Sequence, residues 1–475
     1  MRIRAYVCLA FLARAIDVVC AAGPTALTVN DPGDGGDGTC TTVCTLRDGI
    51  ANVASGGYID FAPELLPATI TLTKGPLLIV KPLSILGPGA EQLAISANSV
   101  SRVLDLESTI FTVQISGVTL RDGRTAGGAG SNGGKETGSS GGTGEFAVGG
   151  CIYAQDSSLH LEKTDIRNCV AQAGNGGHGG SGVPHPSLGG PGGAGGAGGV
   201  ARGGAIFFLT LPATGFQLVL LDSSVTDSQA IGGAGGAGGV GGQGTVVGSG
   251  GSGGEGGRAS GGAIEWYIGS DIPPGSVLVQ NSTVADSAAI GGSGGNGGAP
   301  GGDGGNGGPA FGGHVALDKI NATIDFGTLA TGSTQGGAGG SGSPPGLAGS
   351  ILGAAIYQDK NWAGGIIASS TVIVGPGPLC WSTMYHSGHN LDQDGSCGTF
   401  DLHGSLALFR PPDSGTGRPR YMPVYLSAVI DAAGTCYDHN VLPVDADQLG
   451  TPRPQGDTCD LGAIEADYVF VGEFD

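Results

Sequence analysis

The chain contains a repeated unit, and this repetition constrains its fold more than any other feature. The stretch LVLLDSSVTDSQAIGGAGGAGG, which begins at Leu218, returns as VLVQNSTVADSAAIGGSGGNGG from Val277. When Val225 is aligned with Val284, one column of the repeat holds only aliphatic residues: Leu120, Ile166, Val225, Val284, Leu329 and Val372. A second column, two positions later, holds small polar residues: Asp122, Asn168, Asp227, Asp286 and Thr331. Such columns indicate structurally equivalent coils.

A unit of this size cannot bury its own apolar face, because it has only short strand-like runs and no helical period. It must stack on its neighbours, with equivalent positions about 4.8 Å apart. The sequence therefore predicts an all-β protein, a right-handed single-stranded parallel β-helix that runs from about Ile70 to Val374 with the aliphatic column inward. The alternative is a β-sandwich, but sandwich strands have no reason to repeat at one fixed offset.

Glycine-rich tracts interrupt the coils. Gly 100 and Pro 26 together make just over a quarter of the 475 residues. The excess is confined to five tracts: 127–149, 174–203, 232–261, 291–312 and 336–349. Their three-residue period, as in GGAGGAGG, fits an extended helix such as polyglycine II. A flexible loop is favoured instead, because glycine loses most entropy on ordering and these tracts carry little to bury. All five should leave from one corner and align along one side.

Composition and the N-terminus indicate export. Residues 1–22 resemble a secretory signal, with Arg2 and Arg4 before the apolar run 6–12, although Arg14 interrupts it. The net charge of −20 argues against nucleic acid or an anionic membrane as partner. We expect a secreted or outer cell-surface protein with no transmembrane segment beyond the signal. Its partner would be an extracellular ligand that the sequence does not identify, such as a glycan or a host or matrix surface.

The cysteines support export independently. Apart from Cys8 and Cys20, they fall into four close pairs: Cys40 with Cys44, Cys151 with Cys169, Cys380 with Cys397, and Cys436 with Cys459. An even number in near-neighbour pairs predicts four local disulfides formed in an oxidising compartment. A zinc site built from these cysteines is disfavoured, because no CxxC pair exists and the other ligands are distant in sequence.

The stretch 44–50, Cys-Thr-Leu-Arg-Asp-Gly-Ile, resembles the signature of the CSLREA domain, a module of exported bacterial β-helix proteins. The resemblance covers about residues 25–90 and departs at Gly49, where the family has Ala. It implies secretion and a β-helix behind the module, with no established activity. The residues themselves indicate an N-terminal cap, because Leu46 and Ile50 form one apolar helix face that can cover the open first coil.

Asp31, Asp34 and Asp37 lie in a Gly-rich loop just before this motif. Close acidic residues can form a Ca²⁺ loop, but the spacing is not that of an EF-hand and no distal Glu is placed as in one. A solvated turn is therefore the favoured interpretation.

The C-terminal region carries a second resemblance. The stretches 447–450 (DQLG), 453–454 (RP) and 460–465 (DLGAIE), with 389–392 (HNLD), are similar to the end of choice-of-anchor Q bacterial surface proteins. In that group the region closes a β-helix and precedes an anchor. Only ADYVFVGEFD follows here, so the sequence does not predict how the protein would be retained.

The densest ionisable cluster in the sequence consists of His386, His389, Asp392 and Asp394. Such groups can bind a metal or transfer protons. The resemblance implies that they belong to a structural cap, so we assign them no catalytic or metal role. Basic residues of the coils, by contrast, are scattered across columns: Lys163, Arg167, Lys319 and Lys360.

The sequence predicts four segments: a signal peptide (1–22), the CSLREA-like cap and first coils (23–95), the β-helix with Gly-rich insertions (96–375) and a disulfide-containing C-terminal cap (376–475). The function that fits is a non-enzymatic, adhesin-like or display scaffold. The alternative is a polysaccharide-active lyase or hydrolase, since β-helices often carry such sites. The sequence identifies no catalytic, cofactor-binding or metal residues and no cofactor.

Overall fold

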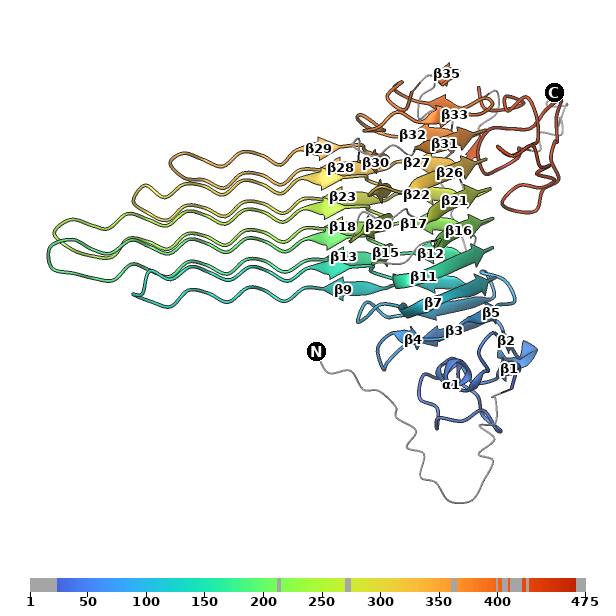
Figure 1. The fold of residues 1–475 in the computed structure, drawn as a ribbon, viewed down its shortest axis with the longest axis horizontal. Coiled ribbons are helices and arrows are strands. Elements are labelled where there is room, and N and C mark those ends of the chain that lie inside the picture. The colour runs from blue at the N-terminus through green and yellow to red at the C-terminus, as the bar shows by residue number, and fades with distance from the viewer. Residues whose placement is uncertain are drawn as a thin grey trace, which may run out of the picture.

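The protein is a parallel β-helix from which a long, narrow arm projects to one side (Figure 1). The computed structural model describes residues 24–211, 215–269, 275–359, 365–398, 400–403, 409–410, 421–423 and 427–466. The predicted signal peptide lies outside these residues, as does Lys360. In the described part of the chain, no helix is long and apolar enough to span a membrane.

Four parallel sheets form the coils. Sheet 1 contains β1 (Ala26–Val29), β2 (Tyr58–Phe61), β4 (Leu77–Ile79), β5 (Leu83–Leu86), β7 (Leu104–Ser116), β11 (Ile152–Glu162), β15 (Ile206–Thr210), β16 (Gln217–Leu221), β20 (Ile264–Ile268), β21 (Ser276–Gln280), β25 (Val315–Leu317), β26 (Asn321–Asp325), β30 (Ile356–Gln358), β31 (Ile366–Ser369) and β33 (Tyr385–His386). Sheet 2 contains β3 (Ala68–Thr71), β6 (Leu93–Ser96), β8 (Thr119–Arg121), β12 (Asp165–Arg167), β17 (Ser224–Thr226), β22 (Thr283–Ala285), β27 (Thr328–Ala330), β32 (Val372–Val374), β34 (Leu391–Asp392) and β35 (Leu402–His403).

Two narrower sheets flank the base of the arm. Sheet 3 contains β9 (Arg124–Ala126), β13 (Val170–Gln172), β18 (Gln229–Ile231), β23 (Ala288–Ile290) and β28 (Ser333–Gln335). Sheet 4 contains β10 (Ala147–Val148), β14 (Ala201–Arg202), β19 (Ala259–Ser260), β24 (Ala310–Phe311) and β29 (Ile351–Leu352). The remaining elements are α1 (Leu46–Asn52), the 3₁₀ turn η1 (Pro63–Leu65) and the antiparallel pair β36 (Phe409–Arg410) and β37 (Met422–Pro423).

The aliphatic column of the repeat is an interior stack in sheet 2, as predicted. Its first five members pair in register and are almost fully buried: Leu120, Ile166, Val225, Val284 and Leu329. The last member was predicted wrongly, because Ile373 pairs with Leu329 while Val372 pairs with Thr328. Val372 is buried on the outer face of the sheet instead. Three consecutive aliphatic residues, Val372 to Val374, hide the period of two that would have fixed the register.

The polar column forms the corner between sheets 2 and 3. Asp227 and Asp286 both have φ of 52°, and Thr331 has φ of 58°. Asp and Asn tolerate this left-handed conformation better than most residues, which explains their recurrence at the corner. The corner then leads into a sheet 3 strand and from there into a glycine tract.

The N-terminal module is part of the solenoid. Strands β1 and β2 pair in parallel, and β2 continues to β5 in sheet 1. Helix α1 buries Leu46 and Ile50, as predicted for the cap, and Thr45 caps its N-terminus by accepting from the Asp48 N–H. The backbone groups of the first coil are therefore covered on this side.

One acidic residue of the N-terminal loop departs from the predicted solvated turn. Asp34 is buried, bonds Arg47 Nε at 2.7 Å and accepts the N–H groups of Thr73 and Lys74. These hydrogen bonds and the Arg47 charge lower the pKa of the Asp34 carboxyl against the opposing effect of burial. Asp34 thus ties the loop to the first coils.

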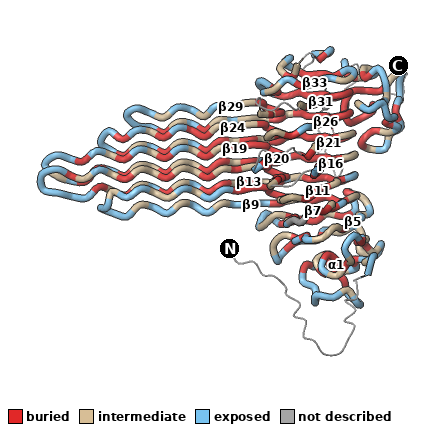
Figure 2. Tube along the Cα trace, viewed as in Figure 1, coloured by how far each residue is buried: buried red, intermediate tan, exposed pale blue. Residues whose placement is uncertain are grey.

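The glycine tracts are ordered, so the prediction of flexible loops was wrong. Each tract runs out from sheet 3 and returns to sheet 4, and the hairpins stack side by side in one two-layered arm (Figure 1). Within a layer, one glycine of each triplet donates to the next coil's tract, as from Gly176 to Ala234 O at 2.8 Å. The next glycine donates across the layers, as from Gly177 to Gly142 O at 2.8 Å. The third residue of each triplet faces outward, which gives the alternation of burial along the arm in Figure 2.

The arm is ordered because glycine at its buried positions lets the tracts approach closely enough to form hydrogen bonds with one another. A Cβ atom at Gly196 would lie 1.8 Å from Gly142 O, whereas the neighbouring outward position, Ala197, is occupied by a methyl group. The flexible-loop prediction considered each tract alone and did not count the backbone hydrogen bonds that the tracts form with one another. These bonds compensate the conformational entropy of glycine.

We predict that Gly196→Ala disorders the arm around it, whereas Ala197→Ser leaves the arm unchanged. The alanine methyl group collides with a backbone carbonyl, which should cost on the order of 3 kcal/mol locally. Amide hydrogen exchange, followed by mass spectrometry on both variants, measures this directly. Equal protection of the tracts in the two variants would contradict the ordered arm.

Candidate functional site

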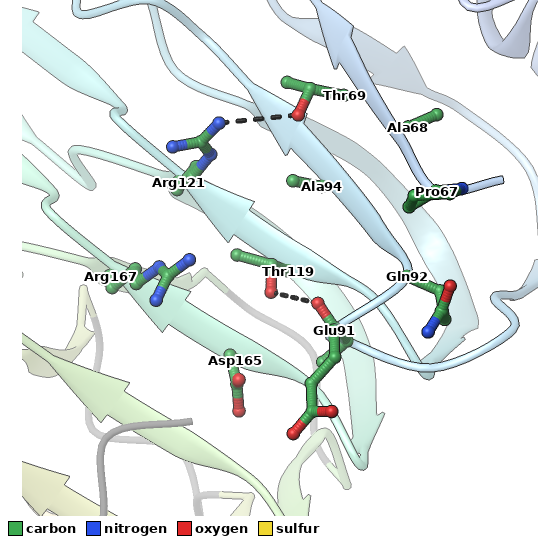
Figure 3. Close-up of a pocket in the computed structure, with 11 residues that line it drawn as sticks. Pro67, Ala68, Thr69, Glu91, Gln92, Ala94, Thr119, Arg121, Asp165 and Arg167 are labelled. Atoms are coloured by element: carbon green, nitrogen blue, oxygen red, sulfur yellow. Dashed lines mark hydrogen bonds between the residues drawn. The ribbon is translucent and has the colours of Figure 1, made fainter. Parts of the chain in front are cut away.

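A groove lies on the outer face of sheet 2, across β3, β6, β8 and β12 (Figure 3). Its volume is about 320 Å³. Arg121 and Arg167 project from paired positions on β8 and β12, one coil apart. Glu91, from the turn before β6, and Asp165, from β12, supply carboxylates to the same groove. Two carboxylates and two guanidinium groups therefore line one hollow, an arrangement able to bind a polar ligand and to exchange protons.

The C-terminal region decides where this groove is open. Farther along sheet 2 the outer face is covered, because Thr283 Oγ1 donates to Gln448 Oε1 at 2.6 Å and Ala463 N–H donates to Thr328 Oγ1 at 2.9 Å. The cover ends near residues 446–450, which line a second hollow of about 520 Å³ beside the groove. On the outer face of β8 and β12, Arg121 and Arg167 stay partly exposed, whereas Thr119 and Asp165 are buried and Asp165 accepts a hydrogen bond from Ser224 Oγ.

A buried ionic network fixes the cover. Arg453 Nη1 donates to Glu465 Oε2 at 2.7 Å, and both side chains are buried. Arg453 also donates to the Asp460 carbonyl and lies over the Phe326 ring at 4.4 Å from its centroid. Burial raises the pKa of Asp460 to about 6. The motif residues at 447–465 thus form a structural clamp; their relation to anchored surface proteins stays a prediction.

The eight paired cysteines occupy the predicted positions. The structure contains the disulfides Cys40–Cys44, Cys151–Cys169, Cys380–Cys397 and Cys436–Cys459. Cys151 and Cys169 lie inside one coil, where both are fully buried. These bonds brace the caps and one coil rather than a functional site.

The histidine and aspartate cluster near residue 390 has structural contacts. Asp392 is buried, bonds His403 Nδ1 at 2.8 Å and accepts the Cys397 N–H. Asp394 accepts from the Leu379 and Ser396 N–H groups, while His389 pairs with Asp401 at 3.1 Å. The four residues thus have separate partners or positions, with His386 ending β33; their assignment to a structural cap without a catalytic or metal role stays a prediction.

Basic residues of the coils are less scattered than the sequence suggested. Arg167 lines the groove and Lys163 lines the neighbouring hollow. The aligned columns of the repeat do not reveal that these residues lie close together, because the groove is lined by residues from several coils and from the turn that contains Glu91.

A buried acidic residue near the base of the arm was missed. Glu265 pairs with Arg202 at 3.4 Å and Arg258 at 3.9 Å, and Arg202 lies 4.1 Å from the centroid of the Tyr267 ring. Burial raises the pKa of the Glu265 carboxyl, and the two arginines oppose that effect. The sequence did contain a sign of this buried charge. In GGAIEW the acidic residue Glu265 occupies the position at which the preceding coil has the apolar Phe207.

The tip of the arm exposes apolar side chains among uncharged polar ones. The hairpins after β13 and β18 extend farthest from the trunk (Figure 1). They are joined at the end by Val246 N–H donating to Ser187 O at 2.9 Å and by pairing of Leu188 with Val246. Val183, Leu188, Val246 and Val247 are exposed there, and the stretches 174–200 and 228–254 contain no Asp, Glu, Lys or Arg. We call these four side chains the tip cluster.

One buried histidine was also missed. His314 is fully buried where the adjacent coils have Ala263 and Ala355, and neither ring nitrogen has a hydrogen-bond partner of good geometry. Burial, offset in part by the Ala330 backbone, lowers the pKa of His314 to about 3.

We predict that His314 makes stability fall with acidification. Between pH 6.5 and 3 the unfolded chain binds a proton at this residue and the folded chain does not, so the stabilisation present above pH 6.5 is lost as the pH falls. The full effect across this interval is on the order of 5 kcal/mol. Urea unfolding of the wild type and His314→Ala between pH 7 and 4 should show a shallower pH dependence in the variant. Parallel curves would refute this assignment.

Comparisons with known proteins identify no related sequence. No family model matches the chain, and no curated protein matches its sequence. Among solved structures, the crystal structure of pectate lyase Pel9A is similar at 13% identity, covering 93% of this chain and 96% of that one, with a TM-score of 0.28. So low a score carries no functional argument, and the β-helix is established by the parallel pairing of the strands themselves.

Proposed function

We propose that this is an exported recognition protein, in which the β-helix supports a rigid arm and the tip cluster contacts the target without catalysis. The ordered arm carries the proposal. Its hydrogen-bonded hairpins end in exposed, uncharged apolar side chains at the point farthest from the trunk. Contiguous exposed apolar residues are a mark of interaction sites.

The charge distribution supports this role. The chain has a net charge of −20, yet the stretches 174–200 and 228–254 of the two longest hairpins contain no Asp, Glu, Lys or Arg, and Glu255 and Arg258 lie only at the base of the second hairpin. A projecting arm keeps the tip cluster away from the trunk's charge, which would otherwise repel acidic surfaces at short range. The target would be an apolar patch on an extracellular glycan or protein surface.

The disulfides support an extracellular location. Four bonded pairs suit an oxidising compartment, since thiols stay reduced in the cytosol. The signal peptide, the outer-surface location and the adhesin-like role remain parts of this proposal.

Combined replacement of Val183, Leu188 and Val246 by Ser tests the tip. We expect binding to glycan arrays, matrix proteins or cells to fall at least tenfold, because each buried aliphatic side chain contributes about 1 kcal/mol or more to a contact. Surface plasmon resonance against the targets that bind the wild-type protein gives the affinities.

A matched control replaces Leu78, Val80 and Val100, which are similarly exposed on the trunk, by Ser. This variant should bind like the wild type. Unchanged binding by the tip variant, or an equal loss in both variants, would place recognition elsewhere.

A polysaccharide-active enzyme is the second candidate, favoured by the groove on β8 and β12. Arg121 and Arg167 could hold the carboxylate of a uronic acid, since guanidinium groups bind carboxylates well. Glu91 and Asp165 could act as base and acid on the bound sugar.

We predict, for this second candidate, that uronic-acid polysaccharides are depolymerised by the wild type and at least tenfold more slowly by Arg167→Gln. Reducing ends and the ultraviolet absorbance of unsaturated products measure hydrolase and lyase action separately. Arg124→Gln, an exposed arginine of sheet 3, is the control. A wild-type protein inactive on all such polymers rules this candidate out.

A further inference from the structure

Three side chains that can bind a metal meet where the C-terminal region touches the trunk. Asp325 ends strand β26, while Asp438 and His439 belong to the C-terminal loop beside Cys436. One ligand atom from each of the three lies within 4.8 Å of the others. We propose that Asp325, Asp438 and His439 bind a zinc-like divalent cation.

The Asp325 carboxylate calls for a positive partner. Its side chain is fully buried, and its contacts are to His439, with Oδ2 at 2.6 Å from Nδ1 and Oδ1 accepting the backbone N–H at 3.3 Å. Burial raises its pKa, an effect that His439 opposes and Asp438 adds to. A buried carboxylate beside a second carboxylate is costly unless a cation compensates it.

Two other buried carboxylates of this protein pair with an arginine, whereas the buried Asp392 pairs with His403. Asp34 contacts Arg47, and Glu465 contacts Arg453, in each case at 2.7 Å. Among the described residues, no lysine or arginine forms an ion pair with Asp325. Asp325 differs from Asp392 in having a second carboxylate close by, that of Asp438, and a metal ion bound between the two would supply the compensating positive charge.

The loop that contains Asp438 uses one carboxylate oxygen of this residue and leaves the other for a metal ion. Asp438 Oδ1 accepts the N–H groups of Asn440 and Leu442, both at 2.8 Å, which fixes the carboxylate and leaves Oδ2 for the cation. His439, at the next position, already brings Nδ1 to 2.6 Å from Asp325 Oδ2. A tetrahedral ion with bonds of about 2.0 Å needs the Asp325 and His439 atoms to separate by roughly 0.7 Å, a small side-chain adjustment.

The donor set selects the class of cation. Ca²⁺ and Mg²⁺ prefer sites made of oxygen alone, whereas an imidazole with two carboxylates suits Zn²⁺. Three protein ligands leave a fourth position for water. Because one ligand comes from the trunk and two from the C-terminal loop, the ion would crosslink the two parts.

The test is zinc titration of the full chain after treatment with a chelator. Calorimetry should show one Zn²⁺ per chain, the unfolding temperature should rise on zinc addition, and Co²⁺ should give the visible spectrum of a four-coordinate site. Absence of uptake by the wild type would overturn the site, and tighter binding of Ca²⁺ than of Zn²⁺ would overturn the assignment of the cation.

Asp438→Asn is the informative variant. Asparagine keeps the Oδ1 that accepts the Asn440 and Leu442 N–H groups, so the loop should persist, but it removes the anionic ligand. We expect zinc affinity to fall at least tenfold, and Asp445→Asn, an exposed change in the same region, to leave it unaltered. Equal affinity in both variants would show that Asp438 is not a ligand.

Discussion

The hydrogen bond between equivalent backbone positions of successive coils is the interaction on which this structure depends. It runs from Gln229 N–H to Cys169 O where sheet 3 begins and continues without a break into the arm, where Gly176 N–H donates to Ala234 O. The trunk and the arm are therefore one stack with one register. The left-handed corner residues, Asp227 and Asp286, keep successive coils superimposed, so each tract starts where its neighbour can bond to it.

Glycine favours disorder in a single tract but permits order when the tracts pack together. As an isolated residue it maximises chain entropy, but here it is the residue without the Cβ that would block the neighbouring carbonyl. No hairpin can order alone, because its donors need acceptors on adjacent coils. The arm should consequently behave as a cooperative unit whose stiffness depends on its internal hairpins, and a stiff arm can hold an apolar tip at a fixed distance from an acidic trunk.

The sites of chemical interest lie where the C-terminal region meets the coils. The Arg453 network holds that region against sheet 2, and its boundary leaves Arg121 and Arg167 in an open groove. The same packing brings His439 onto Asp325. The coils of a β-helix have a regular outer surface. The C-terminal region that covers part of this surface is irregular, and it creates the hollows and the buried charges.

The sequence by itself determined the coil register, the interior stack through Leu329, the corner residues and the four cysteine pairs, because each depends on local spacing that repeats. Only the tertiary structure decided the order of the glycine tracts, since their stability comes from bonds between tracts far apart in sequence. Three further features could not be predicted from the sequence for the same reason. They are the groove with Glu91 and Arg167, the burial of His314, and the contact of Asp325 with His439. Their members are separated by many residues, and no periodic pattern connects them; what brings them together is the stacking of coils and the folding of the C-terminal region over that stack.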